Sequence, residues 1–501
     1  MTSGAAGDLA RPSVVALGVD IGSTNLKASL VGIGDTVTGL AVCTRPTPRD
    51  ADELVRSAAD LIRTVLVSAP EAPAAIGIAS MAESGVPLGA GDLPLRAVLR
   101  WDGDDDPRDL DAILDGLGRD AVYAATGVPA LPKAPLAQWA RLRRTDPDVW
   151  AGLSRWAGVA DLLGLALTGE LATDHTLAAR TMAYRTADGG DRFDPDLLAA
   201  VGLRPDQLPE VRRPGEAAGR ITAEAASRTG LPAGVPVHIA GHDHAVGAWA
   251  SGARRPGEVA DSLGTAEALL RVLREPLDPE RVRPTGMSLT RTVSGEPALL
   301  AGSANAGALV RWWFAHRIDA REAGDVIDEV GRLGPAPTGL LVLPYLAGRQ
   351  TPQPDRRPDV RILDEDDREA DPRAYPVPVL ARAMLEGLAL HARWMHEEQS
   401  ALAGPAHPPL RILAGPGGGN EPWMRLKAQV FAAPARLTSA TEPVASGAAL
   451  LAASREGLLP GEPPALAGVP LPRDAGDPYQ QMFERFVAAA SGAALAREGE
   501  R

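Results

Sequence analysis

One local pattern occurs twice in the chain, once in each half, and it constrains the fold more than any other feature. In both copies an apolar run ends near an aspartate and a turn of small polar residues follows, at DIGST (20–24) and at DSLGT (261–265). A second apolar run follows each turn, which predicts a strand, a tight turn and another strand. Either turn alone is equally well explained as an ordinary hairpin. Two of them, one in each domain, can face each other across a cleft and hold one polyphosphate.

Strand and helix patterns alternate along the rest of the chain, which is typical of α/β domains. Helical spacing is clear at 52–68 and 376–398, and apolar runs at 75–80, 235–240 and 339–344 predict buried strands. The segment RRPG at 254–257 precedes the second copy of the pattern. We therefore expect an N-terminal domain over residues 12–250 and a C-terminal domain over residues 256–490.

Residues 347–375 break this alternation. They are rich in proline, aspartate and arginine, which predicts a solvated loop without regular structure. Such a loop is a candidate lid for the cleft.

The charge balance argues against nucleic acid as a partner. The chain has 51 basic and 64 acidic residues and a net charge of −13, so it lacks the basic field that grips a phosphate backbone. Its only lysines are Lys27, Lys133 and Lys427, a bias toward arginine that we interpret as codon usage. None of the three follows a glycine, which excludes a Walker A phosphate-binding loop.

Cysteine content and hydropathy favour a cytoplasmic protein without a membrane partner. Cys43 is the single cysteine, so neither an internal disulfide nor a cysteine-rich metal site is expected. Residues 1–13 lack the pattern of a signal peptide, and the apolar stretch at 157–167 is short and interrupted by Asp161.

A glycine-rich segment, AGPGGGN at 414–420, follows a predicted strand and opens a predicted helix. Backbone in such a turn can approach a flat or anionic ligand closely. The segment nearly matches the GxGxxG pattern of dinucleotide-binding domains, but no clear acidic residue lies on a strand about 20 residues further on. Mononucleotide binding is therefore the favoured interpretation.

The segment GHDH at 241–244 places Asp243 between two histidines at the end of an apolar strand. A carboxylate in this position can accept a proton from a bound hydroxyl. Two alternatives remain for the tetrapeptide alone. His242 and His244 could form half of a metal site, or Asp243 could cap the next helix. The GxSxG and HExxH signatures of common hydrolases are absent from the sequence.

Taken in order, the segments of this chain resemble the FGGY family of carbohydrate kinases, which belongs to the superfamily of actin-like and Hsp70-like ATPases. The resemblance runs from about Val14 to about residue 455. The segments that carry it are DIGSTNLKA, GIASMAESG, PLRAVLRWD, AGHDHAVGA, DSLGTAEAL, AGALVRWW, LPYLAGRQTP, RAMLEGLAL, GPGGGNEPW and EPVASGAALLAA. It implies two RNase H-like α/β domains with a ligand cleft between them, ATP and Mg²⁺ as cofactors, and a homodimer, which members often form.

The resemblance also implies roles for individual residues. Asp243 would be the general base that takes the proton of the acceptor hydroxyl, and Asp20 would organise Mg²⁺. Ten positions fall where the family binds ATP. Ser23, Thr24, Gly264 and Thr265 would contact the phosphates, and Lys27 lies beside the first turn. Gly307 and Arg311 would contact the nucleotide, and Gly417, Gly418 and Asn420 would contact the adenosine. Phosphoryl transfer needs mainly positioning and charge stabilisation, which suits this set.

The acceptor pocket departs from that of familiar members. The sequence has Met81-Ala82-Glu83 where many pentulose kinases carry Gln-Met-His, and glycerol kinases carry a glutamate at the last of these positions. By the same resemblance Trp101 and Asp102 would contact the acceptor, with Arg100 as the alternative in a register shifted by one. His244 follows the expected base where the family often has glutamine or threonine.

Charge bears on the identity of the acceptor. An ionised Glu83 beside Asp102 and Asp243 would repel an aldonate, unless Arg100 or Arg349 points inward. We therefore expect a neutral ketose such as xylulose or ribulose, or a polyol such as glycerol or erythritol, with an aldonate such as gluconate as the alternative. Glu83 could instead form a salt bridge at the cleft rim. The rival function is that of an actin-like ATPase or interaction protein, which needs no sugar pocket.

Overall fold

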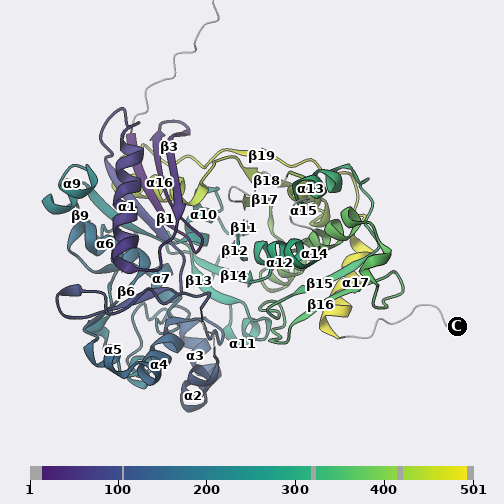
Figure 1. Cartoon of the computed structure of the whole chain (residues 1–501), viewed down its shortest axis with the longest axis horizontal. Helices are drawn as coiled ribbons and strands as arrows, with labels where there is room; N and C mark the ends of the chain where they lie inside the picture. The colour runs from purple at the N-terminus through teal and green to yellow at the C-terminus, as the bar shows by residue number, and fades with distance from the viewer. Residues whose placement is uncertain (1–13, 104–105, 318–322, 415–420, 493–501) are drawn as a thin grey trace, which may run out of the picture.

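The computed structural model describes residues 14–103, 106–317, 323–414 and 421–492 and contains two mixed β-sheets, each packed against helices (Figure 1). We call residues 14–250 the N-lobe and residues 258–492 the C-lobe. In Figure 1 the N-lobe, purple to blue, lies on the left, and most of the C-lobe, green to yellow, lies on the right. Within the described residues, no helix combines the length and apolar composition needed to cross a membrane.

The sheet of the N-lobe has the order β3-β2-β1-β4-β10-β9. Its strands are β1 (Val14–Ile21), β2 (Asn25–Ile33), β3 (Val37–Pro46), β4 (Ala75–Ser80), β9 (Gly219–Arg220) and β10 (Pro236–His242). Strand β2 is antiparallel to β1 and β3, whereas β4 runs parallel to β1 and to β10.

The sheet of the C-lobe repeats this topology in the order β13-β14-β12-β11-β17-β18-β19. Its strands are β11 (Glu258–Leu263), β12 (Glu267–Val272), β13 (Ser288–Arg291), β14 (Pro297–Ser303), β17 (His407–Ala414), β18 (Ala435–Thr438) and β19 (Gly468–Pro470). Strand β12 is antiparallel to β11 and β14, and β17 runs parallel to β11 and β18. Three antiparallel strands followed by two parallel ones thus occur in both lobes, which confirms the predicted α/β fold with two RNase H-like domains.

Helices connect and cover these strands. In the N-lobe they are α1 (Ala51–Leu66), α2 (Arg108–Leu117), α3 (Arg119–Thr126), α4 (Pro135–Thr145), α5 (Pro147–Gly152), α6 (Val159–Thr168), α7 (His175–Ala179), α8 (Pro195–Val201), α9 (Ala223–Thr229) and α10 (Asp243–Ala250). In the C-lobe they are α11 (Pro279–Val282), α12 (Gly307–Arg317), α13 (Ala323–Arg332), α14 (Val377–Ala403), α15 (Glu421–Val430), α16 (Pro443–Arg455) and α17 (Gln480–Ser491).

Helix α1 shows how the local sequence sets an element that the spacing predicts. Asp50 caps its first turn by accepting a hydrogen bond from the amide of Glu53 at 2.8 Å. Leu54, Leu61 and Ile62 recur at helical spacing and are fully buried against the sheet.

Helix α16 comes from the C-terminal part of the chain but packs on the sheet of the N-lobe, against β1 and β4 (Figure 1). Two glycines allow this close approach. A Cβ on Gly18 would lie 1.8 Å from the carbonyl oxygen of Ala445, and one on Gly77 would lie 2.0 Å from that of Ala448. The backbone of α16 therefore lies directly on the two central strands, and it joins the lobes.

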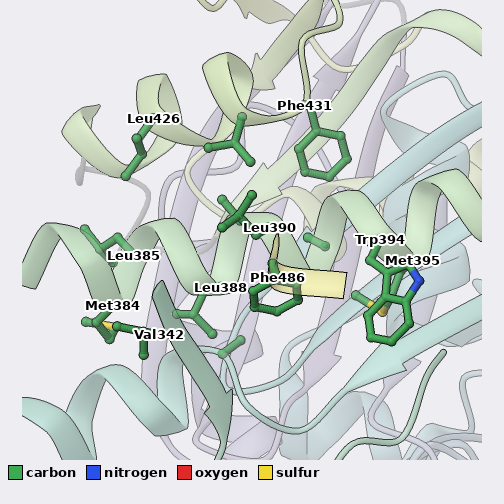
Figure 2. Close-up of a cluster of buried hydrophobic side chains, with 14 of the residues drawn as sticks. Val342, Met384, Leu385, Leu388, Leu390, Trp394, Met395, Leu426, Phe431 and Phe486 are labelled. Carbon is green, nitrogen blue, oxygen red and sulfur yellow. The ribbon is translucent and has the colours of Figure 1, made fainter. Parts of the chain in front are cut away.

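The core of the C-lobe is built around α14. Met384, Leu385, Leu388, Leu390, Trp394 and Met395 of this helix are buried, and Figure 2 shows them among Val342, Leu426, Phe431 and Phe486 from neighbouring elements. Full burial of such side chains contributes about 1.5–3 kcal/mol each.

The predicted loop at 347–375 is wrong in part. Strand β16 (Asp359–Leu363) lies inside this segment and pairs antiparallel with β15 (Leu341–Tyr345). Ile362 and Leu363 bury their side chains in the core, which explains why this charged segment forms a strand. Arg349 is also buried, and its Nη1 atom donates a 2.5 Å hydrogen bond to the carbonyl oxygen of Ala490.

Candidate active site

A cavity of about 420 Å³ brings together most of the residues singled out in the sequence. Volumes of several hundred Å³ are typical of ligand pockets. The predicted residues in its lining are Asp20, Ser23, Thr24, Lys27, Glu83, Trp101, Asp243, His244, Gly264, Thr265, Gly307 and Arg311. They come from both lobes, so one cavity receives both glycine-containing turns.

The first turn, between β1 and β2, is held by backbone contacts. The amide of Gly22 donates to the carbonyl oxygen of Asn25 at 3.0 Å, and the amide of Thr47 donates to the carbonyl oxygen of Thr24 at 3.0 Å. The hydroxyl of Thr47 also donates to the carbonyl oxygen of Gly22 at 2.7 Å. Ser23 and Thr24 are thereby presented to the cavity.

The second turn, between β11 and β12, is fixed against helix α12. The amide of Gly307 donates to the carbonyl oxygen of Gly264 at 3.1 Å, and the amide of Ala308 donates to that of Thr265 at 3.0 Å. A Cβ on Gly307 would lie 2.5 Å from the carbonyl oxygen of Gly264, so only glycine permits this contact. The start of α12, which also carries Arg311, is thus joined directly to the second turn.

Asp20 and Lys27 form a charged pair at the mouth of the first turn. They are opposite residues in the β1–β2 register, and Lys27 Nζ lies 3.2 Å from Asp20 Oδ2. Lys27 Nζ also lies 3.0 Å from Glu442 Oε2, at the start of α16. Burial raises the pKa of Asp20, and the charge of Asp243 acts in the same direction, whereas Lys27 opposes them. Burial alone would lower the pKa of Lys27, but Asp20 and Glu442 outweigh it and raise that pKa.

Asp243 is the first residue of α10, directly after β10. The amide of His244 donates to Asp243 Oδ1 at 2.7 Å, and His242 Nε2 lies 3.1 Å from the same oxygen. Burial holds the pKa of His242 well below its usual value, so this imidazole is neutral. The ligand atoms of His242, Asp243 and His244 lie within 4.8 Å of one another, a spacing that a metal ion could bridge.

The turn before Asp243 is fixed by a buried hydrogen-bond chain. The amide of His242 donates to Thr176 Oγ1 at 2.8 Å, and that hydroxyl donates to Asp174 Oδ1. Gly241 has φ of 130°, and a Cβ there would lie 2.6 Å from Thr176 Oγ1. This support keeps the Asp243 carboxylate at the cavity wall.

Glu83 forms a buried ion pair, whereas a salt bridge at the cleft rim was the alternative expected from the sequence. Arg180 Nε donates to Glu83 Oε1 at 2.8 Å, and Arg180 Nη2 donates to the same oxygen. Burial would raise the pKa of Glu83, but the charges of Arg180 and Lys133 outweigh it and lower that pKa to about 2. Glu83 also has φ of 51°, an uncommon value for a residue with a side chain that is often found at functional sites.

This ion pair corrects the charge argument made from the sequence. Glu83 is ionised, but its charge is balanced by Arg180 and is flanked by the ammonium of Lys133. We therefore no longer expect Glu83 to repel an aldonate. Arg349, the other cation considered, lies in the C-lobe against Tyr345 and Trp394 and does not point into the cavity.

Two further residues of the predicted acceptor segment do not line the cavity. Arg100 and Asp102 bind each other, with Arg100 Nε 2.8 Å from Asp102 Oδ1, and Arg100 also donates to the carbonyl oxygen of Ser23 at 2.6 Å. They support the first turn, and Asp102 is not at the acceptor end in this structure. Gly417, Gly418 and Asn420 lie outside the described residues.

Three residues of the site escaped the sequence analysis. Lys133 lines the cavity beside Trp101, with its Nζ atom 4.8 Å from the centre of the ring. Arg180 supports Glu83, and Glu442 contacts Lys27. The rarity of lysine in this chain was the one available signal for Lys133, because Lys27 also lies in the cavity and Lys427 is buried in an ion cluster.

Known carbohydrate kinases are similar to most of this chain in sequence and in structure. The chain is 25% identical over 365 residues to a gluconokinase of Bacillus subtilis, covering 69% of this chain and 70% of that protein. It is 27% identical over 409 residues to an autoinducer-2 kinase of Escherichia coli K12, covering 78% and 74%. The crystal structure of a xylulose kinase from Rhodospirillum rubrum superposes with a TM-score of 0.79 at 25% identity, covering 95% of this chain and 98% of that one.

Family assignment rests on both halves of the chain. Residues 15–250 match the N-terminal domain of the FGGY family of carbohydrate kinases, and residues 259–455 match its C-terminal domain. The chain therefore belongs to the FGGY family of carbohydrate kinases, enzymes that transfer a phosphoryl group from ATP to a small sugar or polyol.

Proposed function

We propose that Asp243 is the general base of this kinase and that the two glycine-containing turns hold the phosphates of ATP. The observation that carries the proposal is the placement of Asp243 in one cavity with Ser23 and Thr24 from the N-lobe and Gly264 and Thr265 from the C-lobe. A base and two sets of phosphate donors in one cavity are what phosphoryl transfer to a hydroxyl requires.

The reaction follows from this placement. The acceptor hydroxyl gives its proton to the Asp243 carboxylate, and its oxygen attacks the γ-phosphorus of ATP. The bond between the γ-phosphorus and the bridging oxygen breaks, and ADP leaves. The amides and hydroxyls of the two turns donate hydrogen bonds to the phosphate oxygens, and Arg311 and Lys27 add positive charge beside them. His242 and His244 keep the Asp243 carboxylate oriented toward the acceptor.

Asp20 fits the role of Mg²⁺ ligand. Its Oδ1 atom is buried and makes no hydrogen bond to the described residues, which leaves a carboxylate oxygen available at the phosphate end of the cavity. Oxygen ligands of this type suit Mg²⁺, which often binds one or two carboxylates together with substrate phosphates. When bound, Mg²⁺ neutralises charge on the phosphates.

The acceptor binds at the other end of the cavity, where Glu83, Trp101 and Lys133 lie. The pocket suits a small compound with several hydroxyls, because a carboxylate can accept from hydroxyls and an aromatic ring can cover their carbon chain. We assign the reaction to the cytoplasm, because ATP is available to an enzyme in that compartment.

The test is the formation of ADP from Mg²⁺-ATP in the presence of ketoses, polyols, aldoses and aldonates. The proposal predicts a low basal rate that at least one acceptor stimulates strongly, with one phosphorylated acceptor formed for each ADP. A steady rate of ATP hydrolysis that no acceptor changes would contradict it and would favour an actin-like ATPase.

A further inference from the structure

Lys133 is a cation at the acceptor end of the cavity whose charge the proposed mechanism does not use. It lies in the turn before α4, lines the cavity, and forms no ion pair within 4.0 Å with the described residues. Its ammonium group lies over the Trp101 ring, 4.8 Å from the centre. Of the acids in the lining, Glu83 is held by Arg180, and both Asp20 and Glu442 are held by Lys27. The charge of Asp243 acts on Lys133 from beyond ion-pair distance.

The position of Lys133 is specified by the fold. Gln138 Nε2 donates to the carbonyl oxygens of both Glu83 and Lys133, at 2.7 Å each. Gln138 is buried on α4, and Arg141 Nη2 donates to the carbonyl oxygen of Pro132 at 3.1 Å. One buried amide therefore fixes the backbone of Lys133 relative to that of Glu83. This geometry sets both charged side chains at the same end of the cavity.

The Glu83 carboxylate does not neutralise the ammonium group of Lys133, because it is already paired with Arg180. Arg180 Nε and Nη2, the two donors that contact Glu83, both bind its Oε1 atom, and no hydrogen bond within the described residues reaches Oε2. Oε2 is then available to accept from an acceptor hydroxyl. The pair of Glu83 and Arg180 is neutral as a unit. Burial lowers the pKa of Lys133, whereas the charges of Glu83 and Asp243 act to raise it. A bound carboxylate would act in the same direction as these two acids and would hold Lys133 as an ammonium.

We propose that Lys133 binds a carboxylate of the acceptor, so that the substrate is an aldonate, a small sugar acid, and Lys133 determines this specificity. The inference rests on the proposed function and names its acceptor class. The acid would bind its carboxylate at Lys133, its carbon chain against Trp101 and a hydroxyl at Glu83 Oε2, which leaves another hydroxyl for Asp243. A single ammonium matches a single carboxylate, whereas a phosphate usually gathers several donors.

A lysine at position 133 supplies a point charge at a fixed place in the cavity. The chain has three lysines among 51 basic residues, and the other two, Lys27 and Lys427, each contact two carboxylates. Lys133 would also contact a carboxylate once an acidic acceptor is bound. An ammonium group on a flexible stem differs from the planar fork of arginine in the contacts that it can make.

The experiment compares matched acceptors that differ only at one carbon. Values of kcat/KM are measured for aldonates of four to six carbons and for the alditols with the same stereochemistry, in the wild-type enzyme and in Lys133→Met. We expect the wild-type enzyme to prefer an aldonate over its alditol by at least about 10-fold. We expect Lys133→Met to lower kcat/KM for the aldonate by about 10- to 100-fold and to leave the alditol within about 2-fold, because a charge-assisted hydrogen bond is lost.

The controls separate specificity from folding. Arg56→Met removes an exposed cation on α1 outside the cleft and should change neither acceptor. The wild-type preference is an independent measurement, so it tests the inference even if Lys133→Met fails to fold. A wild-type preference for an alditol, a ketose or a sugar phosphate would overturn the inference while the kinase reaction stands. An equal loss for both acceptors in Lys133→Met would also overturn it. ADP formation that responds to no acceptor would instead contradict the proposed function itself.

Discussion

Arg180 Nε lies 2.8 Å from Glu83 Oε1, and both side chains are almost fully buried, with exposed fractions of 4% and 7% for the two residues. The same guanidinium donates from Nη1 to Ser288 Oγ at 3.0 Å. Ser288 lies on β13 of the C-lobe, so one side chain joins the acceptor end of the cavity to the second lobe. The pair therefore supports both the pocket and the contact between the lobes.

Replacing Arg180 by methionine should strongly destabilise the protein. The change leaves the Glu83 carboxylate buried without its counter-ion, which typically costs about 3–5 kcal/mol. The free energy of unfolding in denaturant measures the effect. Ser288→Ala loses only one hydrogen bond and should cost about 1 kcal/mol. The double variant Glu83→Gln, Arg180→Met should recover part of the loss. Equal, small effects for Arg180→Met and Ser288→Ala would show that the pair is not important for stability.

Gly77→Ala should loosen helix α16 from the N-lobe sheet. The new Cβ would lie 2.0 Å from the carbonyl oxygen of Ala448, a backbone atom that cannot move alone. Overpacking of this kind costs about 1–3 kcal/mol. Gly116→Ala is the matched control, because no atom lies within 4 Å of its Cβ site on α2, and alanine there should stabilise by up to about 1 kcal/mol. Thermal unfolding of the two variants should shift in opposite directions, and shifts of the same sign would contradict the packing of α16.

Asp161 should make stability fall as the pH rises. Burial raises the pKa of this carboxyl from 3.8 to about 7, although the amide of Gly158 donates to its Oδ2 atom at 2.8 Å. Between these two pH values the folded protein holds a proton that the unfolded chain has lost. Its contribution to the free energy of unfolding therefore decreases with rising pH, by up to about 1.4 kcal/mol per pH unit. The loss is complete above pH 7.

The variant Asp161→Asn isolates this contribution. The difference in unfolding free energy between wild type and variant, measured from pH 4 to pH 8, should change in favour of the variant as the pH rises. A difference that stays constant over this range would mean that Asp161 is ionised in the folded protein throughout.

Lys427→Met should weaken nucleotide binding more than acceptor binding. Lys427 Nζ lies 2.7 Å from Asp261 Oδ2 and also contacts Glu267, and these two acids flank the second glycine-containing turn. Without the ammonium, two buried carboxylates lose their counter-ion beside that turn. Titration with a fluorescent ATP analogue should show a higher Kd, whereas the KM for the acceptor at saturating ATP should stay within about 2-fold. A change confined to acceptor binding would contradict this placement of the cluster.

Local sequence patterns predicted the elements that carry the site. The two turns after β1 and β11 and the position of Asp243 at the end of a strand follow from short-range signals, and the structure brings them into one cavity. Strand and turn chemistry is local, so the alternation of apolar runs and small polar residues was sufficient for these parts.

Long-range contacts explain what the sequence could not show. Arg180 reaches Glu83 across 97 positions, and α16 crosses to the sheet of the other lobe because two glycines permit it. Lys133 was taken as part of a codon bias because nothing near it in the sequence marks a ligand. Strand β16 was missed because its charged neighbours at 355–373 hide the buried pair Ile362 and Leu363.

The central claim is that Asp243 takes the proton of the acceptor hydroxyl, and rapid-quench single-turnover kinetics of Asp243→Asn tests it most directly. With the best acceptor bound, phosphoryl transfer should slow by about 10²- to 10⁴-fold, whereas the Kd for ATP should stay within about 2-fold. Asp35→Asn makes the same chemical change at an exposed turn and should leave both values unchanged. A transfer rate in Asp243→Asn close to that of the wild type would contradict the assignment of Asp243 as the base.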